Sequence, residues 1–289
     1  MAPSSQLRWD VFVAPEKPVT TGDLPPGLSR RMWSPTSATL IYGERDAVLV
    51  DPLLTVDETR ALANWIAAKG KQLTTIYVTH GHGDHSFGIS VLREKFPAAR
   101  ALATERVLRH MRKQAAPDYI RRVWESYFPG QLPREVAFPE PLQGDRFELE
   151  GHELIAVELG HTDTDDTTCL HVPSLGLVVA GDAAYNDVQP YFGDSSPQGR
   201  RDWLAALDKI ESLAPRAVVA GHKRPGNDDA PRIIEETRKY IRDFDRAAQE
   251  TATARELYLA MRALYPDRVN PGMLWSSARA TKPAIGATP

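Results

Sequence analysis

The sequence has little of several features that mark whole classes of protein. Its 289 residues include a single cysteine, Cys169, so no intrachain disulfide can form, which fits a reducing compartment. No apolar run approaches the length needed to cross a membrane, and the N-terminus lacks a basic segment followed by a long apolar one. We therefore expect a cytoplasmic protein with no signal peptide and no membrane partner.

Charge of one sign is not concentrated anywhere in the chain. Lys and Arg number 35 and Asp and Glu number 38, which gives a formal net charge of −3. No basic stripe stands out, so nucleic acid is not an expected partner. With 42% hydrophobic and 25% charged residues, the composition is that of an ordinary globular protein. Neither an internal repeat nor a long linker is evident, and we expect one domain over residues 1–289.

Apolar, β-branched runs alternate with helical patterns through the first three quarters of the chain. The pattern predicts a hairpin at 38–44 and 47–52, a helix at 55–70, a strand at 74–79 and a helix at 90–96. It predicts later strands at 145–151, 152–160, 167–173, 176–182 and 216–222, a helix at 201–214 and further helices over 230–264. Residues 104–128 are helical in character, broken at Pro117, and form an insertion that is a candidate lid. This order is typical of a layered α/β protein.

Histidine is scarce, with eight in the chain, yet three of them fall within six residues together with an aspartate. His80 and His82 are two residues apart at a strand end, so both rings can face one metal ion. Gly83 lets the chain turn, which aims Asp84 and His85 elsewhere. Imidazole and carboxylate suit zinc. Two adjacent ions would accommodate four such ligands on one short loop with less strain than a single ion.

Three further polar residues each follow an apolar strand and a glycine. His161 comes after IAVELG, Asp182 after LVVAG and His222 after AVVAG. Because glycine permits a turn, each side chain can reach the sheet edge, where α/β proteins hold their sites. Together with the histidine-rich loop, these residues predict a metal site at that edge.

These motifs resemble those of a known family. HGHGDH at 80–85, GH at 160–161, GD at 181–182 and GH at 221–222 occur in the order and rough spacing of the metallo-β-lactamase superfamily. The resemblance covers about residues 36–226. It implies a four-layer αββα sandwich with metals at one sheet edge, to which this chain adds the helical insertion and the C-terminal helices. One departure is visible, because many relatives have a glycine pair where this chain has Ser86-Phe87-Gly88.

The resemblance also implies a set of metal ligands. The first metal would be held by His80, His82 and His161. The second would be held by Asp84, His85 and His222, with Asp182 bridging both. Di-iron members of the superfamily usually carry an acidic residue where His82 stands, so histidine there favours two zinc ions and hydrolysis. Manganese or iron loading stays open, because affinity alone does not set occupancy.

The chemistry implied is hydrolysis of a small organic substrate. Two ions about 3.5–4 Å apart would activate a bridging hydroxide to attack a carbonyl, and Asp84 would orient it and pass a proton to the leaving group. Tyr185 stands three residues after Asp182. N-acyl-homoserine lactonases of the superfamily have a similar tyrosine, whose hydroxyl can bond a developing oxyanion. We therefore expect a lactone or another ester as the substrate.

Other interpretations of the same motifs stay open. Thioester, β-lactam or phosphodiester hydrolysis would use the same metals, and glyoxalase-like or persulfide-oxidising enzymes share the ligand motifs. Outside enzymes, the alternative is a metal-stabilised binding module that turns nothing over. Large residues in the insertion, with Tyr191 and Phe192, predict a moderately apolar pocket for a small molecule. The C-terminal helices either cover the sandwich or form a homodimer contact.

Overall fold

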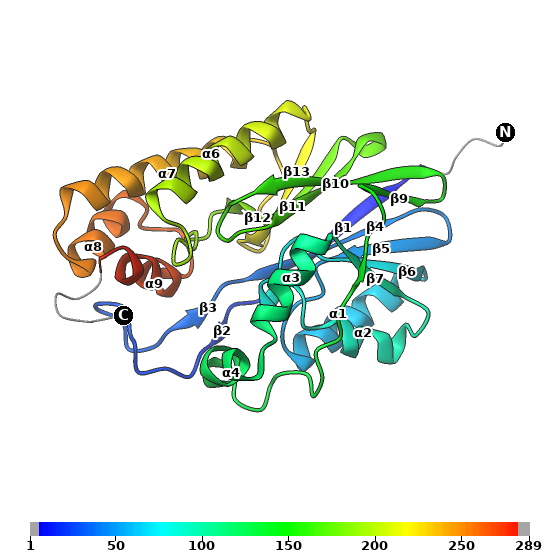
Figure 1. The fold of residues 1–289 in the computed structure, drawn as a ribbon, viewed down its shortest axis with the longest axis horizontal. Helices are drawn as coiled ribbons and strands as arrows, with labels where there is room; N and C mark the ends of the chain where they lie inside the picture. Colours follow the sequence, from blue (N-terminus) through cyan, green and yellow to red (C-terminus); the bar gives the residue numbers. More distant parts are fainter. Residues whose placement is uncertain (1–5, 283–289) are drawn as a thin grey trace.

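The computed structural model describes residues 6–282, so the two ends of the expected domain, 1–5 and 283–289, lie outside the described residues. Its main feature is a large sheet that curls back on itself, with the strand order β8-β7-β6-β5-β4-β13-β12-β11-β10-β9 (Figure 1). The first half holds β1 (Arg8–Ala14), β4 (Thr36–Tyr42), β5 (Asp46–Val50), β6 (Gln72–Tyr77), β7 (Arg100–Ala103) and β8 (Glu140–Pro141). The second half holds β9 (Arg146–Leu149), β10 (His152–Gly160), β11 (Thr167–Val172), β12 (Leu177–Asn186) and β13 (Ala217–Lys223). A separate pair, β2 (Lys17–Pro18) and β3 (Met32–Trp33), lies outside this sheet.

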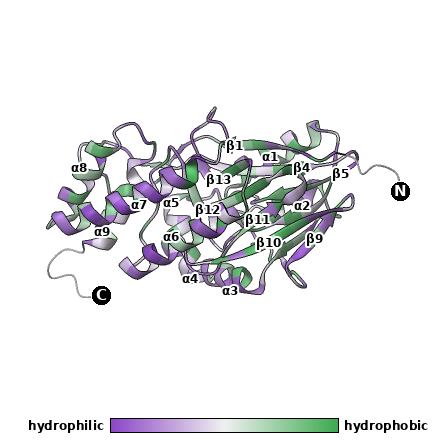
Figure 2. Ribbon diagram, turned by 90° about the horizontal axis from the view of Figure 1, so that it is seen from above, coloured by the Kyte–Doolittle hydropathy of each residue, from purple (hydrophilic) through white to green (hydrophobic). Residues whose placement is uncertain are grey.

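Helices cover both outer faces of the curled sheet, which gives four layers. The first half packs against α1 (Val56–Ala68), α2 (Ile89–Lys95) and α3 (Glu105–Gln114) through one apolar cluster. The second half packs against α6 (Pro197–Ser212) and α7 (Ile233–Glu250) through another. A third cluster, including Ile41, Tyr77 and Val219, fills the space between the halves. The strands are accordingly largely green in the hydropathy view (Figure 2). This is the αββα arrangement expected from the sequence.

Many of the predicted elements form close to their expected bounds. The hairpin is β4 and β5, and the helix at 55–70 is α1, where Thr55 and Glu58 form a reciprocal capping box. The expected C-terminal helices are α7 and α8 (Ala254–Leu264). The sequence does not predict β1, β7 or the last helix, α9 (Pro271–Thr281). β7 reads RALA and has no β-branched residue, so its strand arises from pairing with its neighbours rather than from propensity.

The insertion expected at 104–128 is helical and is broken at the expected proline. It consists of α3, α4 (Pro117–Tyr119), a π-helical turn at Ile120–Trp124 and α5 (Glu125–Tyr127). Pro117 lies in the first turn of α4, where its missing N–H costs nothing. Trp124 packs edge-on against Phe87, with ring centroids 5.9 Å apart. The insertion therefore rests on the loop that carries the clustered histidines.

Membrane insertion through a helix has no support in this fold. Across residues 6–282, every helix is too short or too polar to span a bilayer.

One carboxylate links the two halves of the sheet at the end opposite the histidines. Glu150 lies in the β9–β10 turn with φ 49°, and its carboxylate accepts hydrogen bonds from the backbone amides of Glu44, Arg45 and Asp46 at 2.7–2.9 Å. Those three amides form the β4–β5 turn. Glu150 thus satisfies donors in the first half of the sheet from a turn in the second half.

Replacing Glu150 with alanine should therefore destabilise the fold. Three amides lose their charged acceptor and regain only water, so we expect the free energy of unfolding to fall by about 1–2 kcal/mol. Urea unfolding followed by circular dichroism measures the change. Glu148→Ala, at an exposed position on β9, is the matched control and should stay within about 0.5 kcal/mol of the parent. Equal losses in the two variants would contradict this role of Glu150.

Candidate metal centre

Buried polar side chains gather where strands from both halves of the sheet end. β5 and β6 run parallel, and so do β12 and β13, so within each pair the carboxyl ends lie at the same edge. The loop after β6 carries His80 to His85, and residues 161–163 follow β10. The sequence places Asp182 and His222 after their strands, but β12 and β13 continue past them, with a register shift at Gly181.

The described residues contain three groups of side chains that could hold a metal ion. In each group the ligand atoms lie within 4.8 Å of one another. The groups are His80, His82, Asp163 and Asp182; Asp84, His85 and His222; and Asp51, His80 and His85. Of the seven ligands expected from the sequence, the structure therefore brings six together.

His161 is the expected ligand that the structure does not bring into any of these groups. Its Nδ1 lies 2.6 Å from Asp165 Oδ1, and its Nε2 lies 2.9 Å from the Ser195 hydroxyl. The cause is local: β10 has a register shift between Glu158 and Gly160, and Gly160 has φ 87°. The chain therefore turns so that His161 packs beside α6. The sequence instead predicts that the turn at the preceding glycine brings His161 to the sheet edge.

Asp163 takes the place expected for His161. Its side chain is fully buried, and Asp163 Oδ2 lies 3.0 Å from His82 Nδ1. Its other oxygen, Oδ1, accepts a hydrogen bond from the Thr162 hydroxyl at 3.0 Å. The sequence did offer a signal, because Asp163 opens an acidic run only two residues after His161. The first group in the structure is therefore two histidines and two aspartates.

Unsatisfied polar atoms test whether these residues suit a cation. In the described part of the chain, three buried side-chain atoms lack a hydrogen bond of good geometry: His80 Nε2, Asp163 Oδ2 and Asp182 Oδ1. The two carboxylate oxygens do lie 3.0 and 3.2 Å from nitrogens of His82 and His85, but without the alignment of a hydrogen bond. All three belong to the first group, and each is an atom type that ligates zinc. Buried polar atoms are otherwise almost always paired, because an unmade hydrogen bond costs about 1–3 kcal/mol. The donor set therefore fits a bound divalent cation.

In the second group, Asp84, His85 and His222, the potential ligand atoms also face one another. Nε2 of His85 lies 3.4 Å from Nε2 of His222, so two ring nitrogens point into one space. Asp182 Oδ1 is 3.2 Å from His85 Nε2, and Asp182 Oδ2 is 3.2 Å from His222 Nε2 and 4.0 Å from His80 Nε2. Asp182 therefore lies between the two groups, where a carboxylate can serve both.

Outer contacts fix the orientation of the rings. His222 Nδ1 lies 3.0 Å from the Pro35 carbonyl, and His85 Nδ1 lies 3.2 Å from Asp51 Oδ2. Asp51 is itself held by the amide and hydroxyl of Thr79, at 2.9 and 2.8 Å. Such partners direct the other nitrogen, Nε2, inward as a ligand. Asp51 is not among the residues predicted from the sequence, although it directly follows the apolar run AVLV, much as Asp182 follows its own apolar run.

The carboxylates control the charge of these histidines. Burial favours the neutral rings, but Asp163 raises the pKa of His82 well above its ordinary value, and Asp182 with Asp84 does the same for His85. Burial and the neighbouring His85 lower the pKa of His80 well below its ordinary value. His80 is thus a ready neutral ligand, whereas His82 and His85 must release protons before they can bind a cation.

Two aromatic donors hold the carboxylates. Trp33 Nε1 donates to Asp84 Oδ2 at 3.2 Å, and the Tyr185 hydroxyl donates to Asp182 Oδ2 at 2.9 Å. Burial and the charge of Asp182 raise the pKa of Tyr185 well above its ordinary value, so the hydroxyl keeps its proton. The Tyr185 ring stacks on His222 with centroids 5.6 Å apart. Trp33, on β3, is a contact that the sequence analysis did not anticipate.

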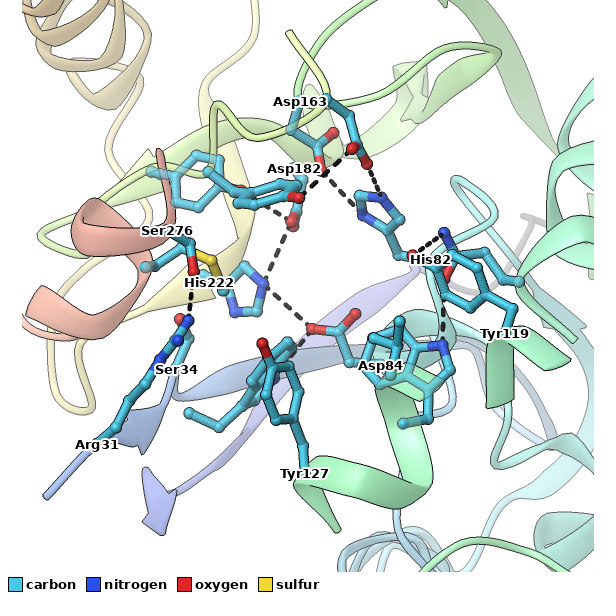
Figure 3. A pocket seen from close by; sticks show the side chains of 18 residues that line it. Arg31, Ser34, His82, Asp84, Tyr119, Tyr127, Asp163, Asp182, His222 and Ser276 are labelled. Atoms are coloured by element: carbon cyan, nitrogen blue, oxygen red, sulfur yellow. Dashed lines mark hydrogen bonds and ion pairs between the residues drawn. The ribbon is translucent and has the colours of Figure 1, made fainter. Parts of the chain in front are cut away.

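A cavity of about 210 Å³ opens onto these side chains (Figure 3). His82, Asp84, Asp163, Asp182 and His222 lie in its polar part. Its other walls come from distant segments: Arg31, Trp33 and Ser34 from the N-terminal region, Tyr119, Trp124 and Tyr127 from the insertion, and Met273 and Ser276 from α9. Among the aromatics expected from the sequence, Tyr191 lines the cavity, while Phe192 is buried in the core beneath α6 and α7. A cavity of this size with these walls can admit a small organic molecule.

Comparisons with known proteins agree with this architecture. A metallo-β-lactamase type 2 of Bacteroides fragilis is 22% identical over 217 residues, 73% of this chain and 76% of that protein. A hydroxyacylglutathione hydrolase of Francisella tularensis subsp. novicida is 36% identical over 64 residues, 22% of this chain and 24% of that protein. A metallo-β-lactamase family protein from Thermus thermophilus superposes with a TM-score of 0.63 at 22% identity, over 94% of this chain and 91% of that chain.

A metallo-β-lactamase from Pontibacter korlensis has the same fold, with a TM-score of 0.60 at 15% identity over 82% of this chain and all of the other. The family model described as the metallo-beta-lactamase superfamily matches residues 31–222, which include every member of the three groups. This chain therefore belongs to the metallo-β-lactamase superfamily.

Proposed function

We propose that this protein is a metal-dependent hydrolase of a lactone or another small ester, with two zinc ions as its cofactors. The observation that carries the proposal is the buried His/Asp cluster at the sheet edge, with three ligand atoms that lack a well-aligned hydrogen bond and a small cavity above it. Structural sites are closed, whereas a site that opens on a cavity can admit substrate. This opening favours catalysis over a purely structural metal.

The residues divide into two ligand sets around a shared carboxylate. His80, His82 and Asp163 would hold one ion, and Asp84, His85 and His222 the other, with Asp182 facing both. Divalent ions in such a pair supply Lewis acidity and lower the pKa of water. Manganese and iron remain alternative ions for the same nitrogen and oxygen donors.

Asp84 is suited to move a proton. Its contacts with Trp33, His85 and His222 all involve Oδ2, at 3.2, 3.8 and 3.5 Å. Oδ1 is therefore the oxygen left to take a proton and deliver it to a leaving alkoxide, and the carboxyl group lines the cavity. Trp33 keeps the group oriented while this happens.

Tyr185 supports a lactone as the substrate, but its hydroxyl is already hydrogen-bonded to Asp182 and is not free to bind an oxyanion. Its hydroxyl has one proton, which it donates to Asp182. Stabilising a substrate oxyanion requires the hydroxyl to give up that bond and turn toward the cavity that it lines. The residue can thus position Asp182 in the resting protein and bond the oxyanion during reaction.

Thioester and β-lactam hydrolysis are the competing activities. The local likeness to a hydroxyacylglutathione hydrolase favours a thioester, and the longer likeness to a β-lactamase, at lower identity, favours a β-lactam. A screen of lactones, aryl esters, thioesters and β-lactams with zinc-loaded protein separates them. The proposal expects kcat/KM to be highest for a lactone or ester.

Metal loading should depend on Asp163 and not on His161. The zinc-replete protein is expected to bind about two equivalents of metal and to lose activity on chelation. Asp163→Ala should weaken binding of one equivalent by at least roughly tenfold, because outer contacts alone already shift metal affinity by about 10–100-fold. Elemental analysis after dialysis against graded chelator measures both values.

His161→Ala is the matched control for that experiment. Its ring contacts Asp165 and Ser195, so both equivalents should remain bound. Metal loss in His161→Ala with full retention in Asp163→Ala would restore the ligand set expected from the sequence. A single equivalent in the parent would overturn the binuclear proposal.

Removing the Tyr185 hydroxyl should slow turnover more than it weakens binding. Tyr185→Phe keeps the stacked ring and deletes one donor, so kcat for a lactone should fall roughly ten- to hundredfold with a smaller change in KM. Steady-state kinetics with saturating zinc measure the two parameters separately.

Tyr119→Phe is the control, because Tyr119 also lines the cavity but its hydroxyl accepts from Gln114 rather than contacting the aspartates. It should change kcat by less than about threefold, because the deleted hydroxyl contacts Gln114 and none of the candidate metal ligands. If Tyr185→Phe instead lowers zinc content and leaves kcat intact at saturating zinc, Tyr185 only positions Asp182.

A further inference from the structure

Arg31 is a buried cation on the cavity wall that the reaction described above does not use. It is 4% exposed, and of the described residues lining the cavity it alone carries a permanent positive charge. Its guanidinium sits over the Tyr127 ring at 5.6 Å and donates to the Ser276 hydroxyl at 2.5 Å. A buried guanidinium ordinarily has a well-formed carboxylate partner, since burying an unpaired charge costs several kcal/mol.

The carboxylate nearest to Arg31 is shared with another guanidinium. Asp23 Oδ2 lies 3.4 Å from Arg31 Nη1, a long contact for a charge-assisted pair. The other oxygen of Asp23 lies 2.7 Å from Arg279 Nη1 and accepts from Trp275 Nε1 at 2.9 Å. Two arginines thus face one carboxylate, so among the described residues Arg31 has only a long, shared ion pair.

The surrounding chain holds Arg31 in place before any ligand arrives. The backbone carbonyl of Arg31 accepts from the Val19 amide at 3.1 Å, which closes the loop between them. A Cβ on Gly272 would lie 2.7 Å from Arg31 Cγ, so α9 leaves room for this side chain only because that residue is glycine. In Figure 3, Arg31 and Ser276 lie on one side of the cavity, with His82 and Tyr119 on the other and Asp84 between them. A molecule across the cavity would touch both Arg31 and the candidate metal ligands.

From this arrangement we propose that Arg31 binds a carboxylate of the substrate, so that the substrate is an ester or lactone carrying an anionic group away from its reacting carbonyl. The proposal rests on the hydrolase function proposed above. The planar guanidinium has donors left for a bidentate carboxylate, and Tyr127 supports its face. Arg31 then gains a close carboxylate partner when substrate binds.

The test compares substrates that differ only in the distal anion. Aryl monoesters of succinic, glutaric and adipic acids are assayed beside aryl esters of butanoic, pentanoic and hexanoic acids. The zinc-loaded parent should show a kcat/KM at least roughly tenfold higher for the best-fitting anionic ester than for its neutral match. Arg31→Gln should remove that preference by raising KM for the anionic ester alone.

Three variants separate recognition from folding. Arg31→Lys keeps the positive charge but cannot bind a carboxylate in a bidentate manner, so it should retain only part of the preference. Arg279→Gln leaves Asp23 to pair with Arg31 alone and lines no part of the cavity, so it should weaken the preference without changing turnover of the neutral esters. Asp23→Asn removes the competing carboxylate and should strengthen the preference. If Arg31→Gln and Asp23→Asn slow both ester series equally, in step with a lower melting temperature, Arg31 is only a structural link to α9 and the proposal is wrong.

Product binding keeps this inference separable from the proposed hydrolase function. Calorimetry of the zinc-loaded protein compares the affinity for adipate, which has two carboxylates, with that for hexanoate, which has one. Neither acid can be turned over. Tighter binding of adipate that is lost in Arg31→Gln supports the anion site even if no ester is hydrolysed. Ester hydrolysis with equal affinity for the two acids would overturn the anion site and leave the hydrolase function standing.

Discussion

The constraint on which this structure depends is the burial of three carboxylates among histidines at one edge of a curled sheet. Asp84, Asp163 and Asp182 are each at most 4% exposed, where an ionised carboxylate is costly unless it is paired. The surrounding histidines pair with them only in part, because His80 Nε2 and an oxygen of each of Asp163 and Asp182 lack a well-aligned hydrogen bond, although both oxygens lie near a histidine nitrogen. A divalent cation completes such a set at once. The outer contacts from Asp51 and Pro35 then act as supports for ligands, beyond their contribution to the fold.

The sheet topology explains why this cluster forms where the two halves join. β4 and β13 meet where His222 lies opposite Thr36, so a ligand strand of the second half borders the first half. The histidine loop follows β6 in the first half, and Asp182 and His222 belong to the second. Each half alone therefore supplies an incomplete ligand set. The cavity above the join is completed by β3, the insertion and α9, segments far apart in the sequence.

The sequence predicts those parts of the fold and site that depend on local patterns. The strands bearing Asp182 and His222 are apolar runs that predict strands. The HGHGDH loop has three histidines and an aspartate within six residues, which is enough to predict a metal site. The position of His161 outside the three groups depends on a register shift and a positive φ at Gly160, which no pattern in the sequence indicates. The roles of Trp33 and Arg31 cannot be predicted from the sequence for another reason. Their contacts with Asp84 and Ser276 join residues 51 and 245 positions apart, and only the folded chain brings them together.

The central claim is that two cations sit in the cluster with Asp163, not His161, completing the first ligand set. Anomalous X-ray scattering at the zinc edge, from crystals of the zinc-loaded protein, tests it directly. The account predicts two neighbouring peaks, one bounded by His80, His82 and Asp163 and the other by Asp84, His85 and His222, with Asp182 touching both. His161 should still contact Asp165. A peak coordinated by His161 with Asp163 turned away, or a single peak in fully loaded crystals, would contradict it.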